Sequence, residues 1–144
     1  MHWISDLREL NKVLIRNQCP LPIIGDVLKK SIGYKFFTKL DITTQYYMLE
    51  LDDESANACT IVTPFGKFKY RRMPMGLKCA PDFAQEVMKN VLRGLEDIEV
   101  DVYLDNVGCF SNSWNQHVKL LDKVLYRLKS NGFTVNPRKC KFAV

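Results

Sequence analysis

The sequence lacks several features that would place it in a well-known class at once. It has five cysteines, but none of them is spaced as in the C-x-x-C pairs of a zinc site. No apolar run approaches the about 20 residues that a membrane-spanning helix needs, and no secretory signal sequence opens the chain. Internal repeats and low-complexity tracts are also missing. We therefore expect an intracellular, cytoplasmic protein with reduced thiols and no membrane partner.

Positive charge is in modest excess. The 144 residues include 21 Lys and Arg against 16 Asp and Glu, which gives a formal net charge of +5. The hydrophobic content of 47% is enough to build the core of one domain. The positive surplus permits a polyanionic partner such as a nucleic acid, but many globular domains carry a similar surplus without one.

The order of sequence patterns predicts an α+β fold. We expect a short helical or irregular segment over 5–14, helices over 23–33, 81–94 and 113–131, a strand over 34–42, a hairpin over 58–73, a strand-turn-strand over 98–110 and a short strand from 133. Residues 43–51 are ambiguous and could form a single helical turn. This order favours an antiparallel sheet with helices packed on one face.

Two of the predicted helices show an apolar stripe. The helix that Pro81 opens has candidate core residues at Phe83, Val87, Met88 and Val91. The helix that Ser113 caps has them at Val118, Leu121, Val124, Leu125 and Leu128. We expect both stripes to face the sheet.

Two carboxylates stand at positions that suit a metal site. Asp41 closes the predicted strand over 34–42, and Asp105 lies at the tip of the turn in "VYLDNVG". Strand ends and tight turns gather at one edge of a layered fold, and carboxylate oxygens there could bind Mg²⁺. Two such ions about 3.5–4 Å apart would activate a hydroxyl and stabilise a leaving oxygen. A purely structural alternative remains for Asn106, because Asn tolerates the positive φ that a two-residue hairpin loop requires.

Six sequence blocks, in order and at matching intervals, resemble the reverse transcriptase of gypsy-type LTR retrotransposons, which is related to the retroviral enzymes. The blocks are "SDLRELNK" (5–12), "PLPII" (20–24), "FFTKLDITTQYY" (36–47), "TIVTPFGKFKYRRMPMGLKCAPDFAQ" (60–85), "VYLDNV" (102–107) and "NGFTVNPRKCKF" (131–142). The resemblance implies the palm, with part of the fingers, of an RNA-directed DNA polymerase. We expect residues 1–144 to form a single partial domain of that kind, without thumb or RNase H.

The resemblance also implies roles for particular residues. Asp41 and Asp105 would bind two Mg²⁺ ions, with Mn²⁺ as a possible substitute, and Tyr46 would be the steric gate that rejects a ribose 2′-hydroxyl. The expected partners are an RNA or DNA template with its primer and a deoxynucleoside triphosphate. In an intact polyprotein, the expected location is the virus-like particle of the retroelement.

Four further residues match positions of the same family. Met75, Gly76 and Gln85 correspond to residues that touch nucleotide or template, and Lys139 to a lysine that protonates the departing pyrophosphate. The residues also have structural alternatives: core packing for Tyr46, capping and packing for Met75 and Gln85, and a solvated surface position for Lys139.

The chain departs from the family pattern at one catalytic position. The family hairpin reads Tyr-x-Asp-Asp, whereas this chain has Asn106 in place of the second Asp. An amide offers a carbonyl oxygen but no negative charge. His2 stands where the family has a triphosphate-binding Arg, and the apolar ending at Val144 suggests a piece of a longer chain. We therefore expect an inactive polymerase fragment. A catalytically silent nucleic-acid-binding module and a decayed retroelement remnant are the alternatives.

Overall fold

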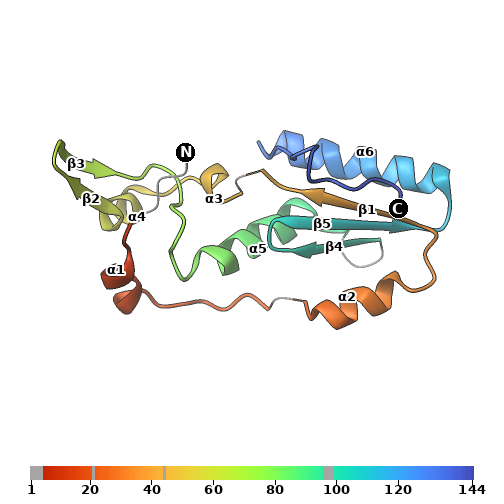
Figure 1. Cartoon of the computed structure of the whole chain (residues 1–144), viewed down its shortest axis with the longest axis horizontal. Helices are drawn as coiled ribbons and strands as arrows, with labels where there is room; N and C mark the ends of the chain where they lie inside the picture. The colour runs from red at the N-terminus through yellow and green to blue at the C-terminus, as the bar shows by residue number, and fades with distance from the viewer. Residues whose placement is uncertain (1–4, 21, 44, 96–98) are drawn as a thin grey trace.

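The computed structural model describes residues 5–20, 22–43, 45–95 and 99–144. Its elements follow one another along an elongated molecule (Figure 1). They are α1 (Arg8–Val13), α2 (Ile24–Ser31), β1 (Phe36–Asp41), α3 (Gln45–Met48), α4 (Asp53–Ala58), β2 (Thr60–Thr63), β3 (Gly66–Lys69), α5 (Ala80–Val91), β4 (Val100–Tyr103), β5 (Asn106–Ser111) and α6 (Trp114–Ser130). The helical turn considered for 43–51 is α3. None of the helices in the described ranges is long and apolar enough to cross a membrane.

The main sheet has three antiparallel strands in the order β1-β5-β4. β5 is therefore the central strand, and it pairs with Phe36–Asp41 on one side and Val100–Tyr103 on the other. The predicted α+β class with an antiparallel sheet is confirmed. A second, two-stranded sheet, β2-β3, stands apart at the other end of the molecule (Figure 1).

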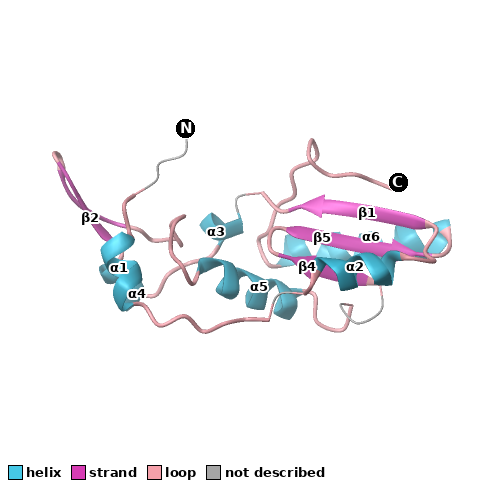
Figure 2. Ribbon diagram, turned by 60° about the horizontal axis from the view of Figure 1, so that its bottom comes forward, coloured by secondary structure: helices cyan, strands magenta, loops and turns pink. Residues whose placement is uncertain are grey.

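The strand residues alternate between the two faces of the main sheet. Leu40, Val102 and Val107 lie on the face that α5 and α6 cover, and each is less than 5% exposed. Their neighbours Asp41 and Asn106 therefore lie on the opposite face, since successive side chains of a strand point to opposite sides. Figure 2 shows α6 behind the sheet and α2 in front of it. An ion pair of 3.3 Å between Lys30 of α2 and Asp101 of β4 ties α2 to the sheet.

The helix α6 buries part of the predicted stripe. Ser113 caps it as expected, since its side chain accepts a hydrogen bond from the Gln116 amide. Its buried residues are His117, Leu120, Val124 and Leu128, so the last two are buried as predicted, and the predicted Leu121 packs partly buried against the core. The other two predicted core residues, Val118 and Leu125, are 47% and 36% exposed. The prediction left out His117 because it did not consider that hydrogen bonds inside the core could satisfy a histidine.

The buried His117 belongs to a polar network between α6 and the sheet. Its Nε2 lies 2.7 Å from Thr38 Oγ1, and its Nδ1 lies 2.7 Å from Ser111 Oγ. Burial lowers the pKa of His117, while the negative charge of Glu99 opposes this change. Both ring nitrogens thus have a partner, which is the condition for a polar side chain to be tolerated in a core.

The helix α5 presents most of the expected face to the core. Met88 is buried as predicted, and Val87 and Val91 pack partly buried against the core. Phe83 is instead 44% exposed, and the buried set includes the polar residues Asp82 and Gln85. Asp82 accepts hydrogen bonds from the Arg16 guanidinium, at 2.5 Å from Nε, and from the Cys19 amide. These bonds lower the pKa of Asp82. They attach the segment after α1 to the first turn of α5.

The C-terminal segment was predicted to begin a strand at 133, and the structure gives it no strand. It runs along the free edge of β1 through isolated bridges, Lys39 with Lys141 and Ile42 with Val135. The Phe37 amide donates to the Val144 carbonyl, and the Val144 amide donates to that of Phe37. Pro137 interrupts the segment, and a residue without an amide hydrogen cannot sustain a continuous ladder.

Candidate active site

The turn between β4 and β5 has two residues, as the sequence suggested, but Asn106 is not one of them. Tyr103 pairs directly with Asn106, so Leu104 and Asp105 alone form the loop. Leu104 has a φ of +53°, and Asn106 is the first residue of β5. The alternative explanation of Asn106 as the residue that supplies a positive φ is therefore wrong. A positive φ at the first loop residue is typical of the primed turns that match the twist of a hairpin.

The structure brings Asp41 and Asp105 to the same place. Asp41 is the last residue of β1 and stands opposite Asn106 in the β1–β5 register. The next amide along the chain, that of Ile42, donates a 2.7 Å hydrogen bond to the Asp105 carbonyl. The end of β1 and the β4–β5 turn thus meet on one edge of the sheet, beside α3 (Figure 1). Both carboxylates are carried by backbone that the sheet holds in place.

Asn106 adds an oxygen that has no hydrogen-bond partner among the described residues. Its side-chain Oδ1 is buried and is the one buried side-chain polar atom in the described ranges without a hydrogen bond. A buried carbonyl oxygen without a donor loses about 1–3 kcal/mol of hydration that nothing replaces. Oxygen ligands are what Mg²⁺ and Mn²⁺ prefer. Two carboxylates and this amide oxygen fit a divalent cation, although the described residues include no cluster of three acidic, Cys or His side chains.

Lys139 and Cys140 approach Asp41 from the C-terminal segment. Lys139 Nζ lies 3.9 Å from Asp41 Oδ1, and the lysine side chain is 66% exposed. The Asp41 amide donates to Cys140 Sγ at 3.4 Å, and its carbonyl accepts from the Asn136 amide at 2.8 Å. The "NPRKC" loop is therefore attached to the backbone of Asp41 itself, which places the lysine cation next to the carboxylate.

Tyr46 lies on α3 within electrostatic reach of the hairpin. Burial raises the pKa of the Tyr46 phenol, and the charge of Asp105 raises it further. The ring is half-buried, and it packs against the core. The packing of Tyr46 agrees with its structural interpretation, and the steric-gate role stays a prediction.

Gln85 supports the hairpin from behind, a role that sequence reasoning missed. It is fully buried. Its Nε2 donates to the Val102 carbonyl at 2.8 Å, and its Oε1 accepts from the Leu104 amide at 2.8 Å. The family resemblance suggested a direct contact with nucleotide or template, whereas both ends of this amide hold the turn. A glutamine among the apolar residues of this helix was the sequence signal that could have indicated this role.

Met75 and Gly76 occupy the loop before α5. Met75 is 37% exposed, and Gly76 has a φ of +101°, a conformation that L side chains rarely adopt. Asn11 of α1 fixes this loop: its Nδ2 donates to the Gly76 carbonyl at 2.8 Å, and its Oδ1 accepts from the Lys78 amide at 2.9 Å. The loop is thus tied to α1, while the carboxylates are tied to the sheet.

Carboxylates that can share a divalent cation, with a lysine and an aromatic ring beside them, are suited to metal-assisted phosphoryl transfer. Comparison with known proteins agrees with that class. Residues 2–144 match the family described as "Reverse transcriptase (RNA-dependent DNA polymerase)". The chain belongs to this family.

Similar curated proteins are retrotransposon polyproteins. The chain is 32% identical over 139 residues to the "Retrovirus-related Pol polyprotein from transposon 297" of Drosophila melanogaster, with 96% of this chain and 13% of the polyprotein covered. It is 32% identical over 142 residues to the "Transposon Tf2-7 polyprotein" of Schizosaccharomyces pombe, with 99% of this chain and 11% of the polyprotein covered. The chain therefore spans about one eighth of the length of these relatives.

Solved structures with the same fold are foamy virus enzymes. A foamy viral protease-reverse transcriptase in complex with double-stranded DNA has a TM-score of 0.88 at 18% identity, with 98% of this chain and 25% of that chain covered. A foamy viral protease-reverse transcriptase in complex with an RNA/DNA hybrid has a TM-score of 0.85 at 18% identity, covering 95% of this chain and 18% of that one. These likenesses establish the fold of a reverse transcriptase palm region.

Proposed function

We propose that this chain is the palm, with part of the fingers, of a reverse transcriptase that belongs to a longer retrotransposon polyprotein. The reaction proposed for the intact protein is transfer of a nucleotide from a deoxynucleoside triphosphate to a primer 3′-hydroxyl on an RNA or DNA template. The observation that carries the proposal is the register that sets Asp41 opposite Asn106, with Asp105 in the adjoining turn. The DNA and RNA/DNA hybrid in the foamy virus structures support nucleic acid as the partner.

The chemistry follows from what each side chain can do. Asp41 and Asp105 would hold the divalent cations, Mg²⁺ or Mn²⁺, with the Asn106 carbonyl oxygen as a neutral ligand beside them. When bound, such ions lower the pKa of a hydroxyl and neutralise charge on phosphate oxygens. Lys139, next to Asp41, would donate a proton to the departing pyrophosphate. Proton donation by an exposed lysine requires only that its flexible side chain turn toward the leaving oxygen.

Substrate selection would depend on the neighbours of the carboxylates. Tyr46 would limit the space under the sugar and so exclude a ribose 2′-hydroxyl. Met75 and Gly76 would face the incoming base and template, with the positive φ of Gly76 letting the backbone come close. Gln85 would act through the backbone of the hairpin, as a positioning residue.

The amide at 106 makes this chain, as it stands, a poor catalyst. Replacing a carboxylate by an amide removes one negative charge where two divalent ions repel each other, and charge compensation is strongest near the ions. We propose that the chain alone does not synthesise DNA. A silent nucleic-acid-binding module is the second candidate, favoured by the combination of Asn106 with a net charge of +5.

The test is primer extension by a chimaera in which this chain replaces the matching segment of a related polymerase. With Asn106 kept, we expect synthesis to be near background; Asn106→Asp should restore it, and Asp41→Ala in that background should abolish it again. Asn106→Asp in the chain alone should tighten Mn²⁺ binding without producing turnover. Equal synthesis by the chimaera that keeps Asn106 and by the one that carries Asn106→Asp would contradict the proposed loss of function at this hairpin.

A further inference from the structure

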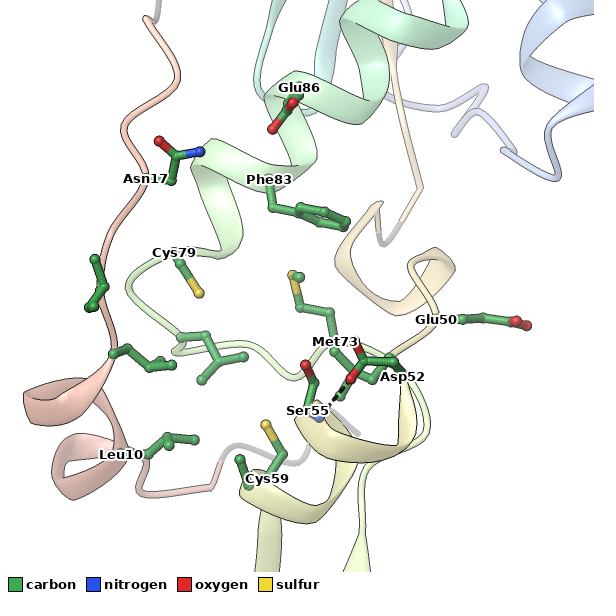
Figure 3. Close-up of a pocket in the computed structure, with 15 residues that line it drawn as sticks. Leu10, Asn17, Glu50, Asp52, Ser55, Cys59, Met73, Cys79, Phe83 and Glu86 are labelled. Atoms are coloured by element: carbon green, nitrogen blue, oxygen red, sulfur yellow. Dashed lines mark hydrogen bonds between the residues drawn. The ribbon is translucent and has the colours of Figure 1, made fainter.

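A pocket of about 330 Å³ lies away from the carboxylates, between α1, α4 and the start of α5 (Figure 3). One wall comes from α1 and the segment after it, another from α4, and the third from the loop and helix that follow Met73. The size falls within the range of small-molecule sites, which are about 300–1,000 Å³. The candidate active site does not use this pocket.

Most of the lining is apolar. The apolar side chains include Leu10, Leu14, Leu51, Met73, Leu77 and Phe83. Figure 3 shows Phe83 directed into the space, with the sulfur atoms of Cys59 and Cys79 on its other sides. Phe83 is 44% exposed although it stands on the first turns of the central helix α5. Such a lining favours a ligand with an apolar body, because its transfer from water releases hydrophobic free energy.

The charged residues among those that line the pocket are all acidic: Glu50, Asp52 and Glu86. Glu50 pairs with Arg72 at 3.0 Å, and Asp52 accepts from the Ser55 amide at 2.7 Å as the cap of α4. That hydrogen bond lowers the pKa of Asp52, so this carboxyl stays ionised at neutral pH. Glu86 has no ion pair within the described part of the chain. Because Arg72 offsets the charge of Glu50, Asp52 and Glu86 supply the negative charge of this acidic opening, which favours a cation over a phosphate.

The thiol of Cys59 contributes a neutral surface to the pocket. Cys59 is 3% exposed and forms no disulfide. Burial raises its pKa, and the neighbouring Cys79 raises it further. A protonated, buried thiol behaves as a small apolar group and is a poor nucleophile. Cys59 therefore suits reversible contact with an apolar body better than covalent capture.

We propose that this pocket binds an amphipathic organic cation, that is, a small molecule with an apolar or aromatic body and one basic nitrogen. The body fills the space around Phe83 and Leu77, and the cation lies at the acidic opening near Glu86. None of Asp41, Asp105 and Asn106 lines this pocket. An occupant contacts α1 and α5 together, and it thereby stabilises the Met75–Gly76 loop, which precedes α5 and is hydrogen-bonded to Asn11 of α1.

Three probes with one apolar body and different head groups test the proposal on the whole chain: 4-phenylbutylamine, 4-phenylbutan-1-ol and 4-phenylbutyrate. Isothermal titration calorimetry should show the amine binding about two- to fivefold more tightly than the alcohol, the range expected for one exposed ion pair. The carboxylate should bind more weakly than both. Added salt should reduce the preference for the amine, because exposed charges are screened.

Two variants locate the site. Ala58→Trp should fill the pocket and abolish binding of all three probes, while Glu86→Gln should weaken the amine about two- to fivefold and leave the alcohol unchanged. Glu54→Gln, on the exposed side of α4 outside the lining, is the matched control and should change nothing. If Ala58→Trp does not fold, chemical-shift changes at the Leu77 and Cys79 amides in the unmodified chain still report occupancy.

Binding of the three probes with equal affinity would overturn the proposal, as would the absence of binding at millimolar concentration or amine binding that Glu86→Gln and Ala58→Trp leave intact. None of these measurements involves DNA synthesis. The failure of the proposed polymerase function would therefore leave this inference standing, and the reverse is also true.

Discussion

The described part of the chain contains two antiparallel hairpins, β2–β3 and β4–β5, that differ in what holds them. In β4–β5, residues of alternate positions such as Val102 and Val107 are buried under α5 and α6. In β2–β3, every residue of β3 is exposed, and Phe65 in the turn is 92% exposed. One hairpin is part of the core of the molecule, and the other projects from it.

The two turns also differ in which residues hold them. The β2–β3 turn is held by its own residue Thr63, whose hydroxyl donates to the Gly66 carbonyl at 3.1 Å and accepts from the Phe65 amide at 3.2 Å. The β4–β5 turn is held by Gln85, which comes from another element. Local chemistry is enough to form a hairpin. The placement of Asp105 opposite β1 requires a contact from a residue outside the hairpin.

Removing these contacts should give the largest difference between the hairpins in the free energy of unfolding. Gln85→Leu keeps the volume of the side chain but leaves the Val102 carbonyl and the Leu104 amide unpaired, which should cost about 3 kcal/mol of unfolding free energy. Thr63→Val removes the corresponding bonds of the exposed turn and should cost less than about 1 kcal/mol. Urea unfolding followed by circular dichroism measures both. Similar losses would mean that Gln85 does not hold the active-site hairpin.

Truncation of one valine in each hairpin should give the next largest contrast. Val107 is fully buried, and Val107→Ala should lower the free energy of unfolding by about 2 kcal/mol through lost burial and a residual cavity. Val62 is 76% exposed, and Val62→Ala should change it by less than about 0.5 kcal/mol. The same unfolding assay applies. A loss as large as that of Val107→Ala in the Val62→Ala variant would show that the β2–β3 hairpin is covered in solution.

A third contrast uses pH, because His117 lies beneath the main sheet. Its pKa in the folded chain is below the ordinary value of 6.5, so the unfolded chain binds the proton more readily. The contribution of His117 to stability should therefore be constant above pH 6.5 and fall as the pH drops below it. Urea unfolding between pH 5 and 8 measures this slope, and His117→Gln should remove it. A slope that persists in the variant would assign it to other groups.

Substitution of one residue by glycine in each of the two turns should have the smallest effect on the free energy of unfolding. Leu104→Gly relieves a left-handed φ, which offsets the entropy that glycine gains in the unfolded chain, so the net change should be less than about 0.5 kcal/mol. Phe65→Gly relieves no such strain and should cost about 0.5–1 kcal/mol. Thermal unfolding of the two variants compares them directly. A larger loss for Leu104→Gly than for Phe65→Gly would show that the leucine side chain, and not the turn geometry, dominates at this position.

Several parts of the fold followed from local sequence signals. The strand ending at Asp41, both hairpins, the Ser113 cap and the helix after Pro81 are encoded by neighbouring residues, through turn chemistry, capping and β-branched runs. The block pattern from "FFTKLD" to "VYLDNV" was specific enough to identify the family before any geometry was known. Asp41 and Asp105 could be selected in the same way, since both close elements that sequence defines.

Other features were decided only by tertiary packing. Sequence could not show that Leu104 takes the positive φ while Asn106 enters β5, because the turn register depends on Gln85 reaching across from α5. Nor could it place His117 on the buried face of α6, where this residue is acceptable because Thr38 and Ser111 satisfy both ring nitrogens. A residue's type fixes its local preferences, whereas the partner that allows it to be buried comes from elsewhere in the chain. For that reason sequence alone determined the elements and the family. The tertiary structure decided that Gln85 supports the hairpin and that the Asn106 oxygen has no hydrogen-bond partner within the described part of the chain.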